Sequence, residues 1–170
     1  GHGGVSEDSH ICLPTDDRPF SELQGTDLLP YKKLIAANLE AIMMAHIMFP
    51  AIDTEIASLS EEWISQRLRQ ELRFDGIVFS DDLMMEGAAI GGSYTERARR
   101  ALGAGCDVLL VCNHREAAQR VVRDLENWSE LPTTRDLTTM KGKGPTLGLA
   151  GLRRSDSWKH AYAYLKASHP

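Results

Sequence analysis

Three short apolar runs constrain the fold of this 170-residue chain more than any other feature of its sequence. They span residues 41–49 (AIMMAHIMF), 76–80 (GIVFS) and 107–112 (DVLLVC). Runs that are almost continuously apolar are typical of parallel strands that helices cover on both faces. We therefore predict one buried strand from each run.

Segments with helical spacing lie between and beside these runs. Their apolar positions are Tyr31, Ile35 and Leu39; Ile64, Leu68 and Leu72; Ala98, Ala101 and Leu102; and Ala118, Val121, Val122 and Leu125. Candidate caps precede them at Thr26, Ser60, Ser93 and Asn113, and the last two stand three residues before a glutamate, as in a capping box. This alternation predicts an α/β fold with a parallel sheet.

Three strands do not close a barrel, and a (β/α)8 barrel needs about 250 residues. Two architectures remain: a small open sheet, or the second part of a barrel whose first part is absent. The chain opens in the glycine-rich stretch Gly1-His2-Gly3-Gly4 without an initiator Met, which favours the second. After Trp128 the pattern weakens, so we place one domain over residues 1–130 and a tail over residues 131–170.

The tail is interpreted as a linker followed by a short helix. Prolines and glycines are frequent up to Gly151, and Trp158, Tyr162 and Leu165 could share one helical face. The run Lys141-Gly142-Lys143-Gly144 has a phosphate-binding loop as its alternative interpretation. It lacks the Walker spacing and no strand precedes it.

The charge balance excludes the excess of basic residues that is typical of a nucleic-acid-binding surface. Lys and Arg number 19 against 24 Asp and Glu, a net charge of −5, so we expect no nucleic-acid partner. The one basic cluster, Arg97, Arg99 and Arg100, is interpreted as a solvated helix face. No apolar run approaches the ~20 residues of a membrane span, so we expect no membrane partner.

Three cysteines occur without a C-x-x-C pair, at Cys12, Cys106 and Cys112. This pattern indicates reduced thiols in a reducing compartment. Cys106 and Cys112 sit in apolar stretches and are predicted to be small buried side chains.

Asp8 and His10 form the first candidate site, in a polar, glycine-rich loop. On an extended loop, residues two apart point to the same side, so the carboxylate can hold one imidazole nitrogen. Such a pair suits a general acid/base that works near neutral pH. The alternative is a solvated turn that Asp8 caps.

Asp81 and Asp82 form the second candidate site, directly after the second predicted strand. Catalytic groups of α/β folds lie at the carboxyl ends of strands, where a carboxylate can serve as nucleophile, base or metal ligand. Adjacent side chains in an extended segment point opposite ways, so we expect one of the two to face the site. The alternative is helix capping by aspartate.

His46 is the third candidate, inside the first predicted strand with Met44 and Met48 on the same face. It either lines the mouth of a barrel or is a core histidine with satisfied hydrogen bonds, and we favour the core.

Metal binding has little support. A ligand set can be drawn from His2, His10, Asp8 and Asp81, but H-E-x-x-H or comparable spacing is absent from the sequence. We expect neither a metal nor an organic cofactor.

Taken together, these stretches resemble glycoside hydrolase family 3, in its β-N-acetylglucosaminidase branch. Gly1-His2-Gly3 followed by Asp8-Ser9-His10 is similar to the family loop K-H-F-P-G-H-G…D-S-H, and residues 74–88 (FDGIVFSDDLMMEGA) are similar to its nucleophile segment. Residues 44–47 and 104–113 also resemble segments of this family. The resemblance runs from residue 1 to about residue 128, and more loosely to residue 158.

The resemblance implies a TIM barrel whose site lies at the carboxyl ends of the strands, with residues 1–130 as its C-terminal half. It implies that Asp81 is the nucleophile, His10 the acid/base and Asp8 its dyad partner. The implied enzyme is a cytoplasmic, retaining β-N-acetylglucosaminidase that removes terminal N-acetylglucosamine from muropeptides in peptidoglycan recycling.

The chain departs from the family pattern at its start. It lacks K-H-F-P and about five barrel strands, and the residues that hold the sugar in the family lie in that part, so no substrate-binding residue is assigned. We expect an unpaired ladder edge, self-association through exposed half-barrel faces, and weak or no activity of the chain alone. The alternative is a non-catalytic half-barrel, either a fragment or a module that needs a partner chain.

Overall fold

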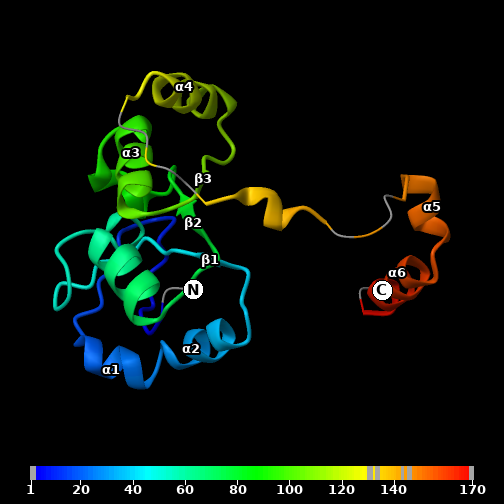
Figure 1. Ribbon diagram of the computed structural model, residues 1–170, viewed down its shortest axis with the longest axis horizontal. Helices are drawn as coiled ribbons and strands as arrows, with labels where there is room; N and C mark the ends of the chain where they lie inside the picture. Colours follow the sequence, from blue (N-terminus) through cyan, green and yellow to red (C-terminus); the bar gives the residue numbers. More distant parts are fainter. Residues whose placement is uncertain (1–2, 130–131, 133–134, 143, 145–146, 169–170) are drawn as a thin grey trace. The chain divides into compact units, whose positions relative to one another are not determined.

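The computed structural model describes residues 3–129, 132, 135–142, 144 and 147–168. Two compact units make up the chain, Gly1–Leu137 and Thr138–Pro170. The first unit holds the sheet and all the candidate site residues that the structure describes (Figure 1). The predicted boundary at residues 130/131 stays a prediction.

A three-stranded parallel sheet forms the centre of the first unit, in the order β1-β2-β3 (Figure 1). Its strands are β1 (Ala41–Met43), β2 (Ile77–Asp82) and β3 (Val108–Leu110). Ala41 pairs with Ile77, and Phe79 pairs with Val108. The three apolar runs therefore predicted the strands and their parallel sense correctly.

The first strand is shorter than predicted, ending at Met43 instead of residue 49. The reason is a change of pairing partner along the chain. Met44 N still donates to Phe79 O at 2.9 Å, but Met48 N donates to Pro14 O at 2.9 Å. The second half of the apolar run thus leaves the sheet to pair with the N-terminal loop.

In the first unit, helices alternate with the strands along the chain, as the sequence predicts. The first unit contains α1 (Phe20–Gly25), α2 (Leu29–Ala36), the short 3₁₀ turn η1 (Ala57–Leu59), η2 (Glu62–Glu71), the 3₁₀ segment η3 (Glu86–Gly91), α3 (Tyr94–Ala104) and α4 (Arg115–Glu126). The 3₁₀ turn η4 (Leu137–Met140) is followed by α5 (Leu149–Arg154) and α6 (Asp156–Ser168). Trp158, Tyr162 and Leu165 lie on α6, whereas Lys143 of the glycine-lysine run lies outside the described residues.

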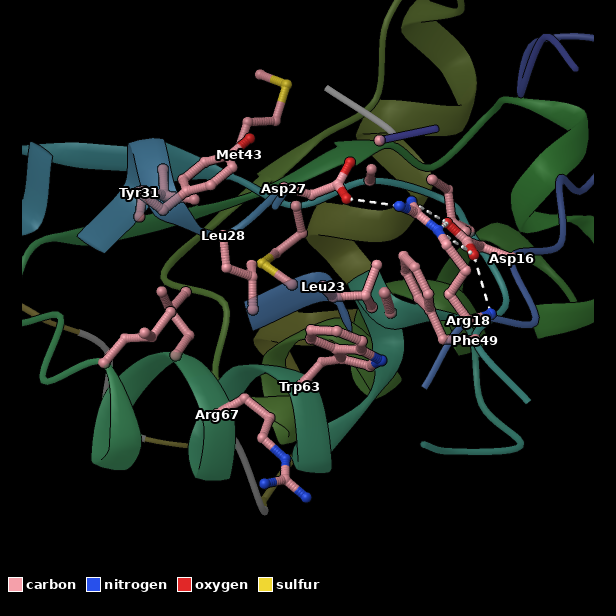
Figure 2. A pocket seen from close by; sticks show the side chains of 18 residues that line it. Asp16, Arg18, Leu23, Asp27, Leu28, Tyr31, Met43, Phe49, Trp63 and Arg67 are labelled. Atoms are coloured by element: carbon pink, nitrogen blue, oxygen red, sulfur yellow. Dashed lines mark hydrogen bonds and ion pairs between the residues drawn. The ribbon is translucent and has the colours of Figure 1, made fainter. Parts of the chain in front are cut away.

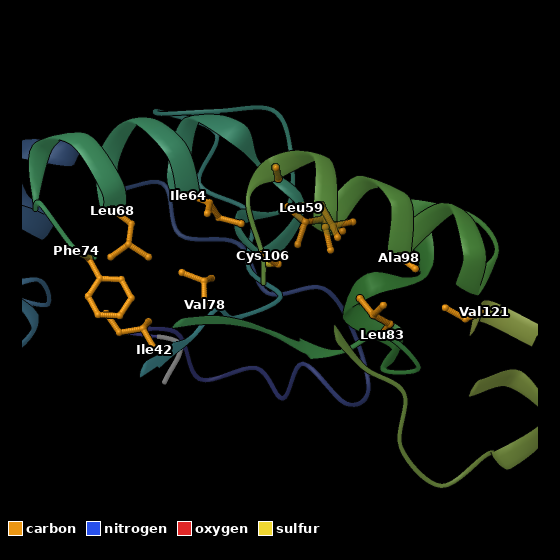
Figure 3. Close-up of a cluster of buried hydrophobic side chains, with 13 residues drawn as sticks. Ile42, Leu59, Ile64, Leu68, Phe74, Val78, Leu83, Ala98, Cys106 and Val121 are labelled. Carbon is orange, nitrogen blue, oxygen red and sulfur yellow. The ribbon is translucent and has the colours of Figure 1, made fainter. Parts of the chain in front are cut away.

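The hydrophobic core lies between the sheet and the helices η2 and α3, which cover one of its faces (Figure 3). Val78 of β2 and Ile64 of η2 are fully buried, and Leu83 is buried just after β2 ends. Ala98 of α3 is fully buried in the same cluster. This packing fixes the end of β2 in a rigid environment.

The capping box of α3 forms as predicted. Glu96 N donates to Ser93 Oγ at 3.3 Å, and Ser93 N donates to Glu96 Oε2 at 2.7 Å. Gly105, with φ of +114°, ends the helix in a left-handed conformation.

Two other predicted caps are wrong. Asn113 adopts a left-handed φ of 59°, so the cap of α4 is His114, whose Nδ1 accepts from Ala117 N at 3.1 Å. Thr26 ends α1 and donates its hydroxyl to Glu22 O at 2.8 Å. Both cases arise because a cap depends on the backbone angle at one residue, which spacing does not determine.

The prediction of a solvated arginine face on α3 is also wrong for Arg97. This side chain is only 9% exposed, and Nη1 donates to Leu83 O at 2.7 Å while Nε donates to Gly92 O at 2.7 Å. Arg100 forms an ion pair with Glu55. The helix turns Arg97 inward because carbonyl groups of the segment after β2 lie there without strand partners.

The cysteines divide into two environments, and all three are free thiols. Cys106 is buried as predicted, and burial raises the pKa of its thiol to about 12. Cys112 is exposed, contrary to prediction, because β3 ends at Leu110. Within the described ranges, no helix has the length and apolar character that crossing a bilayer requires.

Replacing Ser93 with Ala should lower the free energy of unfolding by about 1 kcal/mol, because α3 loses its capping box. Urea denaturation followed by circular dichroism measures the change. Ser21→Ala, at an exposed serine inside α1, is the matched control and should change stability by less than about 0.5 kcal/mol. Equal losses in the two variants would contradict the assignment.

Candidate active site

Asp8 and His10 lie in a solvent-exposed tight turn that Asp8 caps, as in the alternative interpretation, and not in the extended loop on which we based their pairing. His10 N donates to Asp8 Oδ1 at 2.9 Å, and Ile11 N donates to Asp8 O at 2.9 Å. His10 Nδ1 lies 2.8 Å from the same carboxylate oxygen. The turn brings the two side chains together as effectively as an extended segment would.

The contact with Asp8 determines which nitrogen of His10 is available for chemistry. A carboxylate only accepts hydrogen bonds, so Nδ1 donates and Nε2 is left to exchange a proton with a ligand. The His10 side chain is 73% exposed and that of Asp8 55%, so the pair is accessible from solvent. The arrangement is that of a general acid/base held by a carboxylate.

Gly87 brings this turn to the carboxyl end of β2. Gly87 N donates to Ser9 O at 3.0 Å, so the turn lies against η3, which follows β2 after three intervening residues. A Cβ atom at residue 87 would lie 2.9 Å from Ser9 O and 3.1 Å from His46 Cβ. Only glycine allows this approach, which places the turn at the same rim of the sheet as Asp81.

Asp81 and Asp82 end β2 and have different roles in the hydrogen-bond network. One carboxylate oxygen of Asp82 accepts from Met84 N and from Cys112 N, each at 3.1 Å, and so ties the turn after β2 to the end of β3. Asp81 Oδ1 accepts from Asp82 N at 2.8 Å and is half-buried. Asp82 therefore links the turn after β2 to the end of β3, whereas the hydrogen bond of Asp81 is to the adjacent amide of the same strand.

His46 is a core histidine with satisfied hydrogen bonds, as we favoured. Its side chain is fully buried; Nδ1 lies 2.6 Å from Ser58 Oγ, and Nε2 lies 2.9 Å from Asp82 O. Burial lowers the pKa of His46, although the charges of Asp81 and Asp82 act in the opposite direction. The ring is therefore neutral near pH 7.

A cavity of about 250 Å³ lies beside β1, between α1, α2 and η2 (Figure 2). Its wall is mainly apolar and includes Met43, Phe49 and Trp63. None of Asp8, His10 and Asp81 lines it. Because the cavity lacks the reactive groups, we do not place the chemistry there.

The polar end of this cavity is a charge network that sequence reasoning missed. Arg18 donates to Asp16 Oδ2 at 2.7 Å and to Asp27 Oδ2 at 2.8 Å (Figure 2). The hydrogen bond from Arg18 lowers the pKa of both acids, so both stay ionised. Asp16 and Arg18 are close in sequence, but Asp27 follows α1, and no local spacing connects it to them.

His2, one member of the proposed set of metal ligands, lies outside the described residues. Among the residues that the structure does describe, no group of three His, Cys, Asp or Glu side chains is arranged to hold a metal ion.

Comparison with known proteins places these features in a family. Residues 1–135 match the model of the glycosyl hydrolase family 3 N-terminal domain. The chain is 46% identical to a beta-hexosaminidase of Methylococcus capsulatus over 162 residues, which is 95% of this chain and 48% of that protein. It is 40% identical to a beta-hexosaminidase of Pseudomonas aeruginosa over 168 residues, 99% of this chain and 49% of that protein.

Solved structures agree with these matches. NagZ from Neisseria gonorrhoeae, in complex with N-trifluoroacetyl-D-glucosamine, is similar with a TM-score of 0.75 and 36% identity over 100% of this chain and 49% of that one. CbsA from Thermotoga neapolitana is similar with a TM-score of 0.68 and 34% identity, over 75% of this chain and 30% of that one. The three parallel strands and their helices are part of a TIM-barrel-like domain.

The chain spans about half the length of the beta-hexosaminidases that it matches. The family model covers most of the chain, and the residues that it covers include Asp8, His10 and Asp81. On these grounds, the chain belongs to glycoside hydrolase family 3.

Proposed function

We propose that this chain carries the catalytic groups of a retaining β-N-acetylglucosaminidase. The observation that carries the proposal is the hydrogen bond from Gly87 N to Ser9 O, because it holds the Asp8–His10 pair at the end of the strand that bears Asp81. Family membership supports glycoside hydrolysis, and the relatives named beta-hexosaminidase support a hexosaminide substrate.

In the proposed reaction, Asp81 attacks the anomeric carbon and the glycosidic bond breaks. His10 donates its proton from Nε2 to the leaving oxygen, and a glycosyl-enzyme ester forms on Asp81. His10 then takes a proton from water, which attacks the same carbon and releases Asp81. Two inversions give net retention of configuration.

Asp8 has the role of holding the His10 ring. Its carboxylate fixes the tautomer with hydrogen on Nδ1 and stabilises the imidazolium that forms when His10 takes the proton. A His–Asp dyad here replaces the second carboxylate that most glycosidases use.

We propose an N-acetylglucosamine-terminated muropeptide as the substrate and peptidoglycan recycling in the cytoplasm as the setting. The support is the motif resemblance, together with the likeness to NagZ from Neisseria gonorrhoeae that was solved with an N-acetylglucosamine analogue.

The second candidate function is a half-barrel module that needs a partner chain. Among the described residues, β1 and β3 each pair with β2 alone, so each has one open edge. Met43 in β1 is 51% exposed although it lies in an apolar run. Open edges and exposed apolar side chains also support the proposal that the chain self-associates.

Replacing Asp81 with Asn should lower glycosidase turnover by at least about 10³-fold, because the covalent route is lost. Turnover is measured with the unmatched half of the Methylococcus capsulatus relative added as a separate polypeptide. Asp82→Asn is the matched control and should cost less, since an amide oxygen can still accept from Met84 N and Cys112 N. A mechanism-based fluorosugar followed by peptide mass spectrometry should label Asp81. A label on Asp82 would overturn the assignment.

Replacing His10 with Ala should lower turnover, in the presence of the same added polypeptide, by an amount that depends on the leaving group of the substrate. A leaving group that needs protonation, such as the sugar of a disaccharide, should lose about 10²–10⁴-fold in turnover. An activated nitrophenyl glycoside should lose less in its first step, because it leaves without a proton. Equal losses with both substrates would argue against a general acid role.

The 170-residue chain alone should hydrolyse an aryl N-acetyl-β-glucosaminide poorly or not at all. Orientation of the reacting groups can account for ~7–11 kcal/mol of barrier lowering. The resemblance implies that the residues that hold the sugar in the family lie in the part of the pattern that this chain lacks. Adding a polypeptide that spans the unmatched half of the Methylococcus capsulatus relative should raise turnover, and should fail to do so with Asp81→Asn. Turnover by the chain alone at the level of the whole relative would contradict this expectation.

A further inference from the structure

We propose that His46 is a positioning residue that sets the orientation of the Asp81 carboxylate by holding the carbonyl of Asp82. The meaning of this role for catalysis rests on the proposed function, but the structural claim stands on the geometry around the end of β2.

The two hydrogen bonds of His46 run in opposite directions. A backbone carbonyl only accepts, so the 2.9 Å contact between His46 Nε2 and Asp82 O requires a proton on Nε2. In the neutral ring, Nδ1 then carries a lone pair and accepts from the Ser58 hydroxyl at 2.6 Å. Ser58 is itself fully buried, so the ring is held from both sides in one tautomer and one orientation.

The Asp82 carbonyl lies next to the amide that binds the Asp81 carboxylate. It is the last carbonyl of β2, and it also accepts from Met85 N at 3.0 Å. The backbone amide of the same residue donates to Asp81 Oδ1 at 2.8 Å. His46 therefore holds one end of residue 82 while Asp81 is bound to the other end, and a rotation of this residue would turn the Asp81 carboxylate.

His46 lies between the two halves of the candidate site. Its Cβ lies 3.1 Å from the point where a Cβ of residue 87 would stand, next to the contact of Gly87 with Ser9. The same side chain thus supports the end of β2 and lies under the turn that carries Asp8 and His10. Arg97 adds a second support by holding the next carbonyl, that of Leu83, at 2.7 Å.

A matched pair of variants separates this role from simple filling of the core. Gln places a donor amide near the position of Nε2, so His46→Gln can keep the bond to Asp82 O and lose the bond to Ser58. Asn places its amide near the position of Nδ1, so His46→Asn can keep Ser58 and lose Asp82. The two variants introduce the same functional group and differ in the contact that they retain.

The experiment is nuclear magnetic resonance of the full 170-residue chain, with three-bond couplings that report the χ1 rotamer of Asp81. We expect a single rotamer in the original chain and in His46→Gln, and loss of the single-rotamer pattern in His46→Asn, together with about tenfold faster amide exchange at Met85. The amide of Val121 in α4 serves as the internal control for the fold and should be unchanged. Identical Asp81 couplings in the two variants would overturn the proposal.

A measurement on the unmodified chain covers the case in which His46→Asn does not fold. Ring 15N shifts should show His46 as the neutral tautomer with hydrogen on Nε2, and a hydrogen on Nδ1 instead would also overturn the proposal. The outcome is distinguishable from that of the proposed function. Loss of the Asp81 rotamer in His46→Asn, combined with full turnover by Asp81→Asn, would support positioning by His46 and refute the catalytic role of Asp81.

Discussion

The close backbone contact at Gly87 is the constraint on which the arrangement of the candidate site depends. Three parts of the chain meet there: the turn with Ser9, the segment with His46, and η3 shortly after β2. A side chain at residue 87 would push the turn away from the sheet, because the nearest neighbours are a backbone oxygen and a Cβ atom that have little freedom to move. The separation of the two candidate catalytic stretches is therefore set by backbone geometry.

Around the end of β2, polar side chains form hydrogen bonds with backbone groups that no longer pair with a neighbouring strand. His46 binds the carbonyl of Asp82, Arg97 binds the carbonyl of Leu83, and the carboxylate of Asp82 binds two amides. Buried backbone groups need such partners, and the cost of leaving one unpaired is about 1–3 kcal/mol. Of the two acids at the end of β2, Asp82 thus binds amides of the turn and of the segment after β3, while Asp81 binds the amide of its neighbour.

Sequence patterns predicted the parts of the structure that depend on local or near-continuous signals. The three strands, the capping box at Ser93 and the pairing of Asp8 with His10 belong to this class. The length of β1 was missed because Met48, near the end of the apolar run, pairs with the N-terminal loop, which lies far away in sequence. The burial of Arg97 and the joining of Arg18 to Asp27 were missed for a similar reason: spacing shows which residues share a face, but not what that face contacts.

The two open edges of the sheet give this chain a property in common with partly assembled forms of larger domains. Among the described residues, β1 and β3 each present one row of backbone groups without a neighbouring strand. Intermediates with unpaired edges and exposed apolar surface are the species that chaperones retain and proteases remove in cells. The steady-state amount of the chain in a cell should therefore depend on how fast those edges are covered, in competition with quality control.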